Sequence, residues 1–352
     1  MGHTGEPEGP ALPIGYPPQP VWVPPGPTAV EVLAGAAAGI GSILAAPLLR
    51  DRMLRTLGVL PGPPSDRSGP ADPVRADRAP ADPGPAGRGP GPQGAGDPGW
   101  FGPDSVAWRV HADPSIFVAG VAAFALQSLH PLALAGVADH GSFAEDFFGR
   151  TQRTGMFVAG VVYGSSADAQ ARVDEVHRVH ERVIGVAPDG RHYSANDPDL
   201  LEWVHVTEYL AIAAASRRFG LIPLERDALD RYVAEVAVVG EAMGITSPPR
   251  SWEALDRAFQ GFRPQLAVGE QTRAGMRLLA DPPGLTPAGR RSWGLIWAGA
   301  LACLPPTAGT LLGFRAPRAG ELVACRSLLM ALGAALGPPP PLLAARRRLG
   351  LD

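Results

Sequence analysis

The chain contains no lysine, so every one of its 31 cationic side chains is an arginine. They are outnumbered by 34 acidic residues, and a formal net charge of −3 provides no positive field that would hold nucleic acid. Only two cysteines occur, Cys303 and Cys325, and they form no CxxC pair. A disulfide framework is therefore not expected, and we predict a cytoplasmic protein that is either free or attached to a membrane.

Several signatures of common enzyme classes are also missing. The sequence has no GxSxG nucleophile motif, no P-loop, no GxGxxG after a strand and no HExxH zinc motif. These absences argue against the hydrolases, nucleotidases, dehydrogenases and metalloproteases that carry such motifs. Any catalytic site must therefore come from residues scattered over several segments.

Changes in composition divide the chain into four parts. Residues 1–27 and 61–99 are rich in proline and glycine, and we expect both to be disordered, the second as a linker. Residues 28–60 are apolar and should form a helix. Residues 100–352 show little strand-like alternation, so we expect one large helical domain and an all-α fold class.

The apolar segment has no charged side chain from Val32 to Leu49, a length at the lower limit for a membrane span. Gly35 and Gly39 form a GxxxG pair of the kind that lets membrane helices approach closely. Most of the segment, however, is weakly hydrophobic alanine and glycine, and Pro47 interrupts its end. Two hypotheses remain open, a helix docked on the main domain and a helix in contact with a membrane.

Apolar spacings of three and four, together with capping residues, predict the helices of the main domain. The clearest signals are Asp197-Pro198 at one start and Gly220 at the matching end. The expected helices cover residues 115–130, 143–162, 166–184, 198–219, 225–243, 251–260, 293–304 and 321–336. The segment VAPDGRHYSANDPD, which follows Gly185, is expected to be a loop because Pro-Asp-Gly favours a turn.

The helix predicted over residues 166–184 carries a histidine on an apolar stripe. On the 3.6-residue period this stripe contains Val173, Val176, His180, Val183 and Ile184. His177 lies to the side and is expected to be more exposed. An imidazole on a dry face either forms hydrogen bonds within a core or ligates a metal. From this helix alone the structural role is favoured, because a buried histidine needs only one polar partner.

The helix predicted over residues 143–162 carries Arg150 and Thr154 one turn apart on one face, with Arg153 beside them. A guanidinium on an apolar face can bind the carboxylate of a ligand or form an ion pair with a nearby acidic side chain. Thr154 can hydrogen-bond a ligand or the carbonyl four residues earlier. These alternatives stay open from the residues themselves.

His205, on the helix predicted over residues 198–219, follows Glu202 with the E-x-x-H spacing of di-iron carboxylate bundles. The nearest second copy is Asp174-x-x-His177. Because half of the di-iron ligand set is missing, a di-iron oxygenase is the weaker alternative.

An ordered set of motifs covers residues 100–350. It comprises GPDSVAWRVHADPSIFVAG (102–120), LHP (129–131), AGVADHGSF, GRTQRT (149–154), VYGS, VHERVIG, DPDLLEWVH, LACLPPTAGTLLGF and PLLAARRR. In this order they resemble the haem-dependent oxygenases of the mycophenolic-acid-oxygenase (MpaB-like) and latex-clearing-protein (rubber oxygenase) type, which has many actinobacterial members.

The resemblance implies a mostly helical fold that buries one b-type haem. His180 matches the axial histidine of the family, and Arg150 and Thr154 match its R-x-x-x-T pair beside the haem. Arg153 takes the place of a lysine that caps the iron in the rubber-cleaving members. A guanidinium stays protonated and is a poor iron ligand, so this difference argues against a lysine-capped resting state and against polyisoprene as the substrate.

We therefore predict a haem b-dependent oxygenase that uses dioxygen on an apolar organic substrate such as a lipid, a terpenoid or a polyketide. His180 is the expected iron ligand, His205 a further haem contact, and Arg150, Arg153 and Thr154 the expected catalytic residues. A non-catalytic haem carrier or sensor would use the same histidine and is the alternative. The expected partners are dioxygen, the apolar substrate and a redox partner, with a peripheral membrane contact through residues 28–60.

Overall fold

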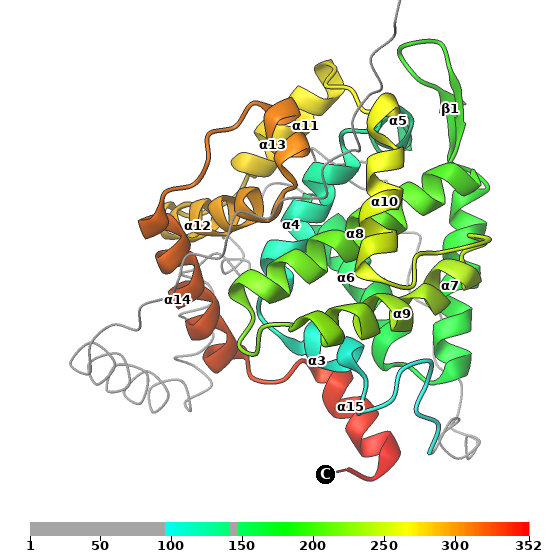
Figure 1. Cartoon of the computed structure of the whole chain (residues 1–352), viewed down its shortest axis with the longest axis vertical. Helices are drawn as coiled ribbons and strands as arrows, with labels where there is room; N and C mark the ends of the chain where they lie inside the picture. The colour runs from blue at the N-terminus through cyan, green and yellow to red at the C-terminus, as the bar shows by residue number, and fades with distance from the viewer. Residues whose placement is uncertain (1–95, 141–146, 352) are drawn as a thin grey trace, which may run out of the picture.

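A computed structural model describes residues 96–140 and 147–351, with the side chains of residues 147–152 left out. Within these ranges the chain forms thirteen α-helices and a single two-stranded sheet, which confirms the all-α prediction (Figure 1). The segments predicted at 1–27 and 28–60, and the linker up to residue 95, lie outside the described residues.

The first half of the described chain holds six helices and the sheet. They are α3 (Val106–Ala112), α4 (Ile116–Gln127), α5 (Pro131–His140), α6 (Phe147–Tyr163), α7 (Ser166–His180), β1 (Ile184–Val186), β2 (His192–Ser194) and α8 (Pro198–Phe219). The second half holds α9 (Arg226–Ala242), α10 (Trp252–Gly261), the 3₁₀ turn η2 (Arg263–Gln265), α11 (Glu270–Ala280), α12 (Pro287–Cys303), α13 (Pro306–Leu312), α14 (Ala319–Leu336) and α15 (Pro340–Leu349).

Helices α4 and α8 form the centre of the fold and make its most extensive interhelical contact (Figure 1). Both contribute small buried side chains, which let two helix axes approach closely. These are Ala119, Ala122, Ala123 and Ala125 of α4 and Ala211, Ala213, Ala214 and Ala215 of α8. Helix α8 begins as the sequence predicts, because the Asp197 side chain accepts a hydrogen bond from the Asp199 amide and Pro198 occupies the first turn.

The remaining helices surround this pair. Helices α9 and α10 pack on α8, α12 packs on α4, and α14 covers α12 at the left edge of the view in Figure 1. Helix α7 lies against α6, and α15 at the bottom of the view also contacts α6. The core therefore runs through the middle of the bundle, and α7 and α14 lie at its periphery.

The C-terminal arginines have a structural role. Arg348 donates from Nε to the Asp97 carbonyl at 2.8 Å and from Nη2 to the carbonyls of Tyr163 and Gly164 at 2.9 and 3.1 Å. It thereby satisfies carbonyls at the end of α6 that have no partner within the helix. This contact ties both ends of the described chain to α6.

Two of the predicted helices end earlier than expected. The helix expected over 115–130 stops at Gln127, and α5 begins at Pro131, because a proline disfavours helical geometry in the residue before it. The helix expected over 166–184 stops at His180. The five helices α3, α5, α11, α13 and α15 were not predicted, since apolar periodicity is hard to read in segments of seven to eleven residues.

The predicted loop after Gly185 is in fact part of a hairpin. Strands β1 and β2 pair antiparallel, with Gly185 opposite Tyr193, and the turn closes through a 2.8 Å bond from the Ala187 amide to the Arg191 carbonyl. The Tyr193 hydroxyl donates to Asp139 at 2.7 Å and fixes the hairpin to α5. Because Ile184 belongs to β1 and is 59% exposed, it leaves the apolar stripe that the sequence assigned to His180.

Candidate functional site

Helix α6 carries the predicted arginine and threonine residues. Arg150 belongs to its first turns, but its side chain lies outside the described residues. Arg153 and Thr154 are exposed, and so is Met156. The apolar face of α6 becomes buried only further along, at Val161 and its neighbours. The expectation that Arg150 and Thr154 lie on the apolar face of this helix is therefore not met at Thr154, and the side chain of Arg150 lies outside the described residues.

His180 is the last residue of α7 and is half-buried. Its Nδ1 atom is shielded from solvent and has no hydrogen-bond partner among the described residues. Burial lowers the pKa of His180, and the nearby His177 ring lowers it further. Asn196 and the Ala195 backbone oppose this shift, but neither makes a hydrogen bond of normal geometry with Nδ1. Burial thus favours the neutral form of the His180 ring, which keeps one buried nitrogen without a hydrogen-bond partner among the described residues.

His177, one turn earlier, is fixed by the protein. Its Nδ1 lies 3.3 Å from Asn196 Oδ1 and its Nε2 lies 3.4 Å from the Ala242 carbonyl at the end of α9. Asn196 also donates to the His177 carbonyl at 3.3 Å. The sequence predicted that His177 would be the more exposed of the two histidines, whereas both are half-buried. What distinguishes them is hydrogen bonding, because His177 has partners and His180 Nδ1 has none.

His205 lies in the core of α8 and is 7% exposed. Its ring meets Tyr209 edge-on, with the ring centroids 4.7 Å apart, and burial lowers its pKa to about 4. Glu208, three residues further along α8, accepts a hydrogen bond from Gln127 Nε2 at 3.2 Å. His205 therefore occupies a packed position between α8 and α9.

Gly240 of α9 makes this close packing possible. A β-carbon at Gly240 would lie 2.8 Å from Pro248 Cβ and 2.9 Å from His205 Cε1. We expect Gly240→Ala to lower the free energy of unfolding by about 1–3 kcal/mol, because the ring and the proline must both move. Urea unfolding measures this change.

Gly120→Ala is the matched control, since Gly120 is an exposed residue of α4 and its added β-carbon would meet nothing within 4 Å. It should raise stability by about 0.5–1 kcal/mol through helix propensity alone. Equal effects of the two substitutions would contradict the packing assigned to His205.

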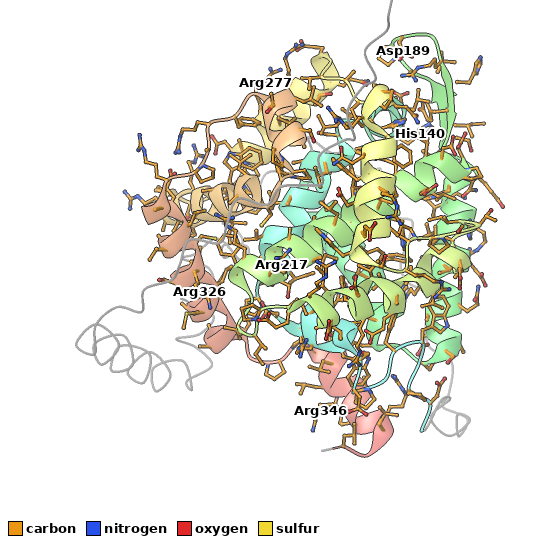
Figure 2. The ribbon with its side chains drawn as sticks, viewed as in Figure 1. His140, Asp189, Arg217, Arg277, Arg326 and Arg346 are labelled. Atoms are coloured by element: carbon orange, nitrogen blue, oxygen red, sulfur yellow. The ribbon has the colours of Figure 1, made fainter. Side chains whose placement is uncertain are left out.

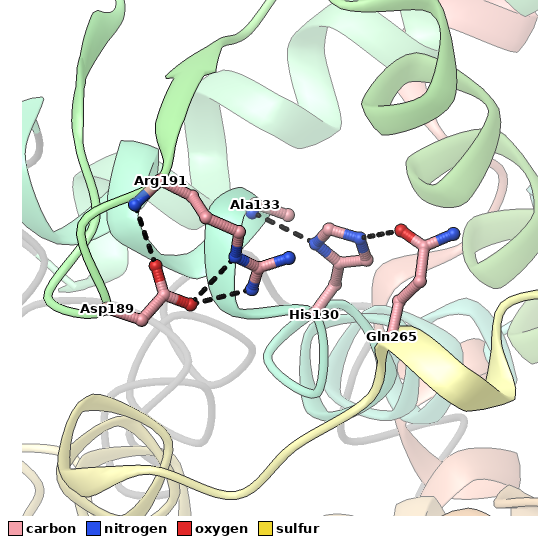
Figure 3. Close-up of polar contacts among 5 residues, drawn as sticks. All are labelled: His130, Ala133, Asp189, Arg191 and Gln265. Atoms are coloured by element: carbon pink, nitrogen blue, oxygen red, sulfur yellow. Dashed lines mark hydrogen bonds and ion pairs between the residues drawn. The ribbon is translucent and has the colours of Figure 1, made fainter.

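Two further buried histidines escaped the sequence analysis. His130 is fully buried, its Nε2 lies 3.0 Å from Gln265 Oε1, and its Nδ1 accepts from the Ala133 amide at 3.5 Å (Figure 3). His111 lies 3.2 Å through Nε2 from the Tyr232 hydroxyl, and burial lowers its pKa to about 4. Gln265 and Tyr232 lie more than 100 residues from His130 and His111 in the chain, so no local pattern could reveal these two contacts.

No metal cluster forms around these residues. Between residues 96 and 351, apart from the undescribed 141–146, no three His, Cys, Asp or Glu side chains come close enough to hold a metal ion together. The E-x-x-H spacing of Glu202 and His205 thus finds no complementary ligands in the described part of the chain. Two pockets, of about 490 and 390 Å³, are lined by residues between Val268 and Phe314, and neither includes His180 or His205.

Comparison with known proteins defines the class. Residues 108–335 match an oxygenase catalytic domain, so this helical domain is an oxygenase. The chain belongs to the family described as ER-bound oxygenase mpaB/B'/Rubber oxygenase, catalytic domain, which confirms the resemblance found in its motifs. No curated protein and no solved structure matches the chain.

Proposed function

We propose that this oxygenase binds one haem b through His180 and uses dioxygen to oxidise an apolar organic substrate. The observation that carries the proposal is the buried Nδ1 of His180, which has no hydrogen-bond partner among the described residues. Leaving such an atom unsatisfied costs about 1–3 kcal/mol. The Nδ1 of His111 is also unpartnered within the described part of the chain but lies in the buried core, whereas His180 is half-buried at the end of a helix, where a ligand can reach it. Family membership supports the oxygenase activity, and the motif resemblance supports the haem.

The chemistry of His180 fits an iron ligand. A metal-bound imidazole must be neutral, and burial keeps the pKa of His180 below its ordinary value. The bound haem would supply the iron on which dioxygen binds and is activated. His177 cannot replace His180 without giving up its contacts with Asn196 and Ala242.

We assign helix α6 a different role, which is to place polar side chains at the edge of the haem. Haem propionates need cationic partners close to solvent, and the exposed first half of α6 offers Arg153 together with Thr154. Arg150 is carried over from the R-x-x-x-T motif as the propionate partner. His205 contributes to the wall of the site as a packed ring and is the weaker candidate ligand.

The test is haem content rather than activity alone. The full chain, produced with haem precursor, should be red and contain one haem per chain by the pyridine haemochrome assay. His180→Ala should lose most of its haem, whereas His177→Ala, a matched histidine one turn away, should retain it. Added imidazole should restore the haem spectrum of His180→Gly, because a free imidazole can occupy the vacated ligand position.

Full haem occupancy in His180→Ala, or equal loss in the two alanine variants, would refute the ligand assignment. Dioxygen consumption with lipid or terpenoid substrates then separates an oxygenase from a haem carrier or sensor. Substrate-dependent uptake of dioxygen that is absent from His180→Ala supports catalysis at this haem.

A further inference from the structure

Helix α14 is apolar on two opposite faces. Its inner face is buried and is formed by Cys325, Leu329, Leu332 and Ala335. Its outer face is exposed and uncharged, and is formed by Val323, Ser327, Met330 and Ala334. On this outer face Val323 is 65% exposed and Met330 is 54% exposed. A surface helix normally places charged residues opposite its buried face, so α14 departs from the usual pattern.

The length and composition of α14 also set it apart. Its 18 residues are apolar enough to cross a membrane, yet only 22% of them are buried within the protein. In the described part of the chain, the bent pair α3 and α4 would be a second such segment, but α4 is part of the core. The exposed side of α14 is therefore suited to an apolar environment outside the protein.

A second pair of exposed apolar residues lies beside α14. Arg326 donates from Nη1 to the Arg218 carbonyl at 3.4 Å and so joins α14 to the end of α8. Leu221 and Ile222 lie three and four residues after Arg218 and are 54% and 63% exposed. At 100° per residue, Arg326 lies within roughly 60° of the outer face of α14. We call Leu221, Ile222, Val323 and Met330 the α14 patch.

Arginines lie beside the α14 patch, at the end of α8 and on α14 itself. Arg217 and Arg218 end α8, and Figure 2 labels Arg217 near the middle of the view and Arg326 on α14 to its left. Anionic lipid headgroups complement such an arrangement, and each arginine near the bilayer surface contributes about 1 kcal/mol.

The charge also distinguishes between the partners that could cover the patch. A symmetric contact with a second copy would bring the same arginines together, and like charges oppose association. The apolar segment from Val32 to Leu49 has no charged side chain and would bring no anionic group to this surface. A bilayer with anionic lipids offers acyl chains to the apolar face and negative headgroups to the arginines.

We propose that the α14 patch and its arginines bind the surface of an anionic lipid bilayer. Helix α14 lies in the interface and does not cross it, because its inner face stays packed on α12. This inference is independent of the haem.

The experiment is flotation of the full chain with vesicles of phosphatidylcholine, with and without phosphatidylserine, at low and high salt. The wild type should bind the phosphatidylserine vesicles and dissociate at high salt. Val323→Glu/Met330→Glu should weaken binding roughly tenfold or more, because it removes apolar contact and adds negative charge.

Ile184→Glu/Val186→Glu is the matched control. These residues are 59% and 51% exposed on β1, on the opposite side of the molecule from α14, and the substitutions add the same charge (Figure 1). The control should bind like the wild type, and unchanged urea midpoints show that both variants fold.

Three outcomes would overturn the proposal. The wild type could fail to bind, both double variants could lose binding equally, or the α14 variant could bind normally, which would assign the contact to residues 28–60. Light scattering that shows a wild-type dimer dissociated by Val323→Glu/Met330→Glu, without vesicle binding, would assign the patch to a second copy.

Discussion

Trp203→Ala should lower the free energy of unfolding by about 3–5 kcal/mol, the largest single-residue effect that we expect on stability. Trp203 has no exposed surface and stacks on Phe259, with ring centroids 5.8 Å apart. It also contacts Phe262 and His130, at 5.2 and 5.9 Å between centroids. Removing the indole leaves a cavity where α8 meets α10, and the surrounding rings cannot close it completely.

The indole N–H of Trp203 also stabilises the fold through a hydrogen bond. It donates to the Gln127 carbonyl at the end of α4 at 3.2 Å, so Trp203 links the two central helices. Trp203→Phe keeps an aromatic ring and should lose only about 1–2 kcal/mol. The next residue provides the control, because Val204 is 41% exposed and Val204→Ala should stay within about 0.5 kcal/mol of the wild type. Urea unfolding that ranks Val204→Ala with Trp203→Ala would contradict this description of the core.

Glu208→Gln should remove a pH dependence of stability that the wild type shows between about pH 4.5 and pH 7. Burial raises the pKa of the Glu208 carboxyl to about 7 from an ordinary 4.5, and the hydrogen bond from Gln127 only partly opposes the shift. Below pH 4.5 the carboxyl is protonated in both the folded and the unfolded chain, so its stabilising effect is fully present. As the pH rises towards 7, the unfolded chain ionises first and folding loses stability.

The loss should reach about 3–4 kcal/mol and be complete above pH 7. Burial lowers the pKa values of His111 and His205 to about 4, which destabilises the fold in the opposite direction as the pH falls below about 6.5. The informative quantity is therefore the difference between Glu208→Gln and the wild type, in which the histidines cancel.

Urea unfolding from pH 4 to pH 8 should show this difference increasing with pH in favour of Glu208→Gln. Glu175→Gln, at an exposed position of α7, is the control for removing one carboxylate from the chain. Parallel stability curves for Glu208→Gln and the wild type would show that Glu208 is hydrated in the folded protein.

Much of the architecture could be predicted from local patterns. The boundaries expected for α8 agree with the structure, because Asp197-Pro198 and Gly220 act within one turn of the helix. The apolar, alanine-rich sequence of α4 likewise indicates a helix buried on most of its surface. Five helices of seven to eleven residues and the short hairpin were missed because their signals extend over few residues, although α10, with ten residues, was predicted.

The candidate site was predicted in part. The motif order indicated both the oxygenase family and the helix that carries His180, and the family is confirmed by the match over residues 108–335. The apolar stripe assigned to His180 was too long, because its last member, Ile184, turns into β1. That His177 has hydrogen-bond partners and His180 Nδ1 has none could not be foreseen, since those partners come from the loop before α8 and from the end of α9.

The sequence by itself determined the all-α class, the extent of the best-capped helices and membership of the oxygenase family, because periodicity, caps and ordered motifs all act over short distances in the chain. Only the tertiary structure decided which histidine nitrogens are buried without a hydrogen-bond partner, which acid becomes hard to ionise and which apolar face remains uncovered. Those properties depend on burial and on partners brought from distant segments, and packing alone establishes them.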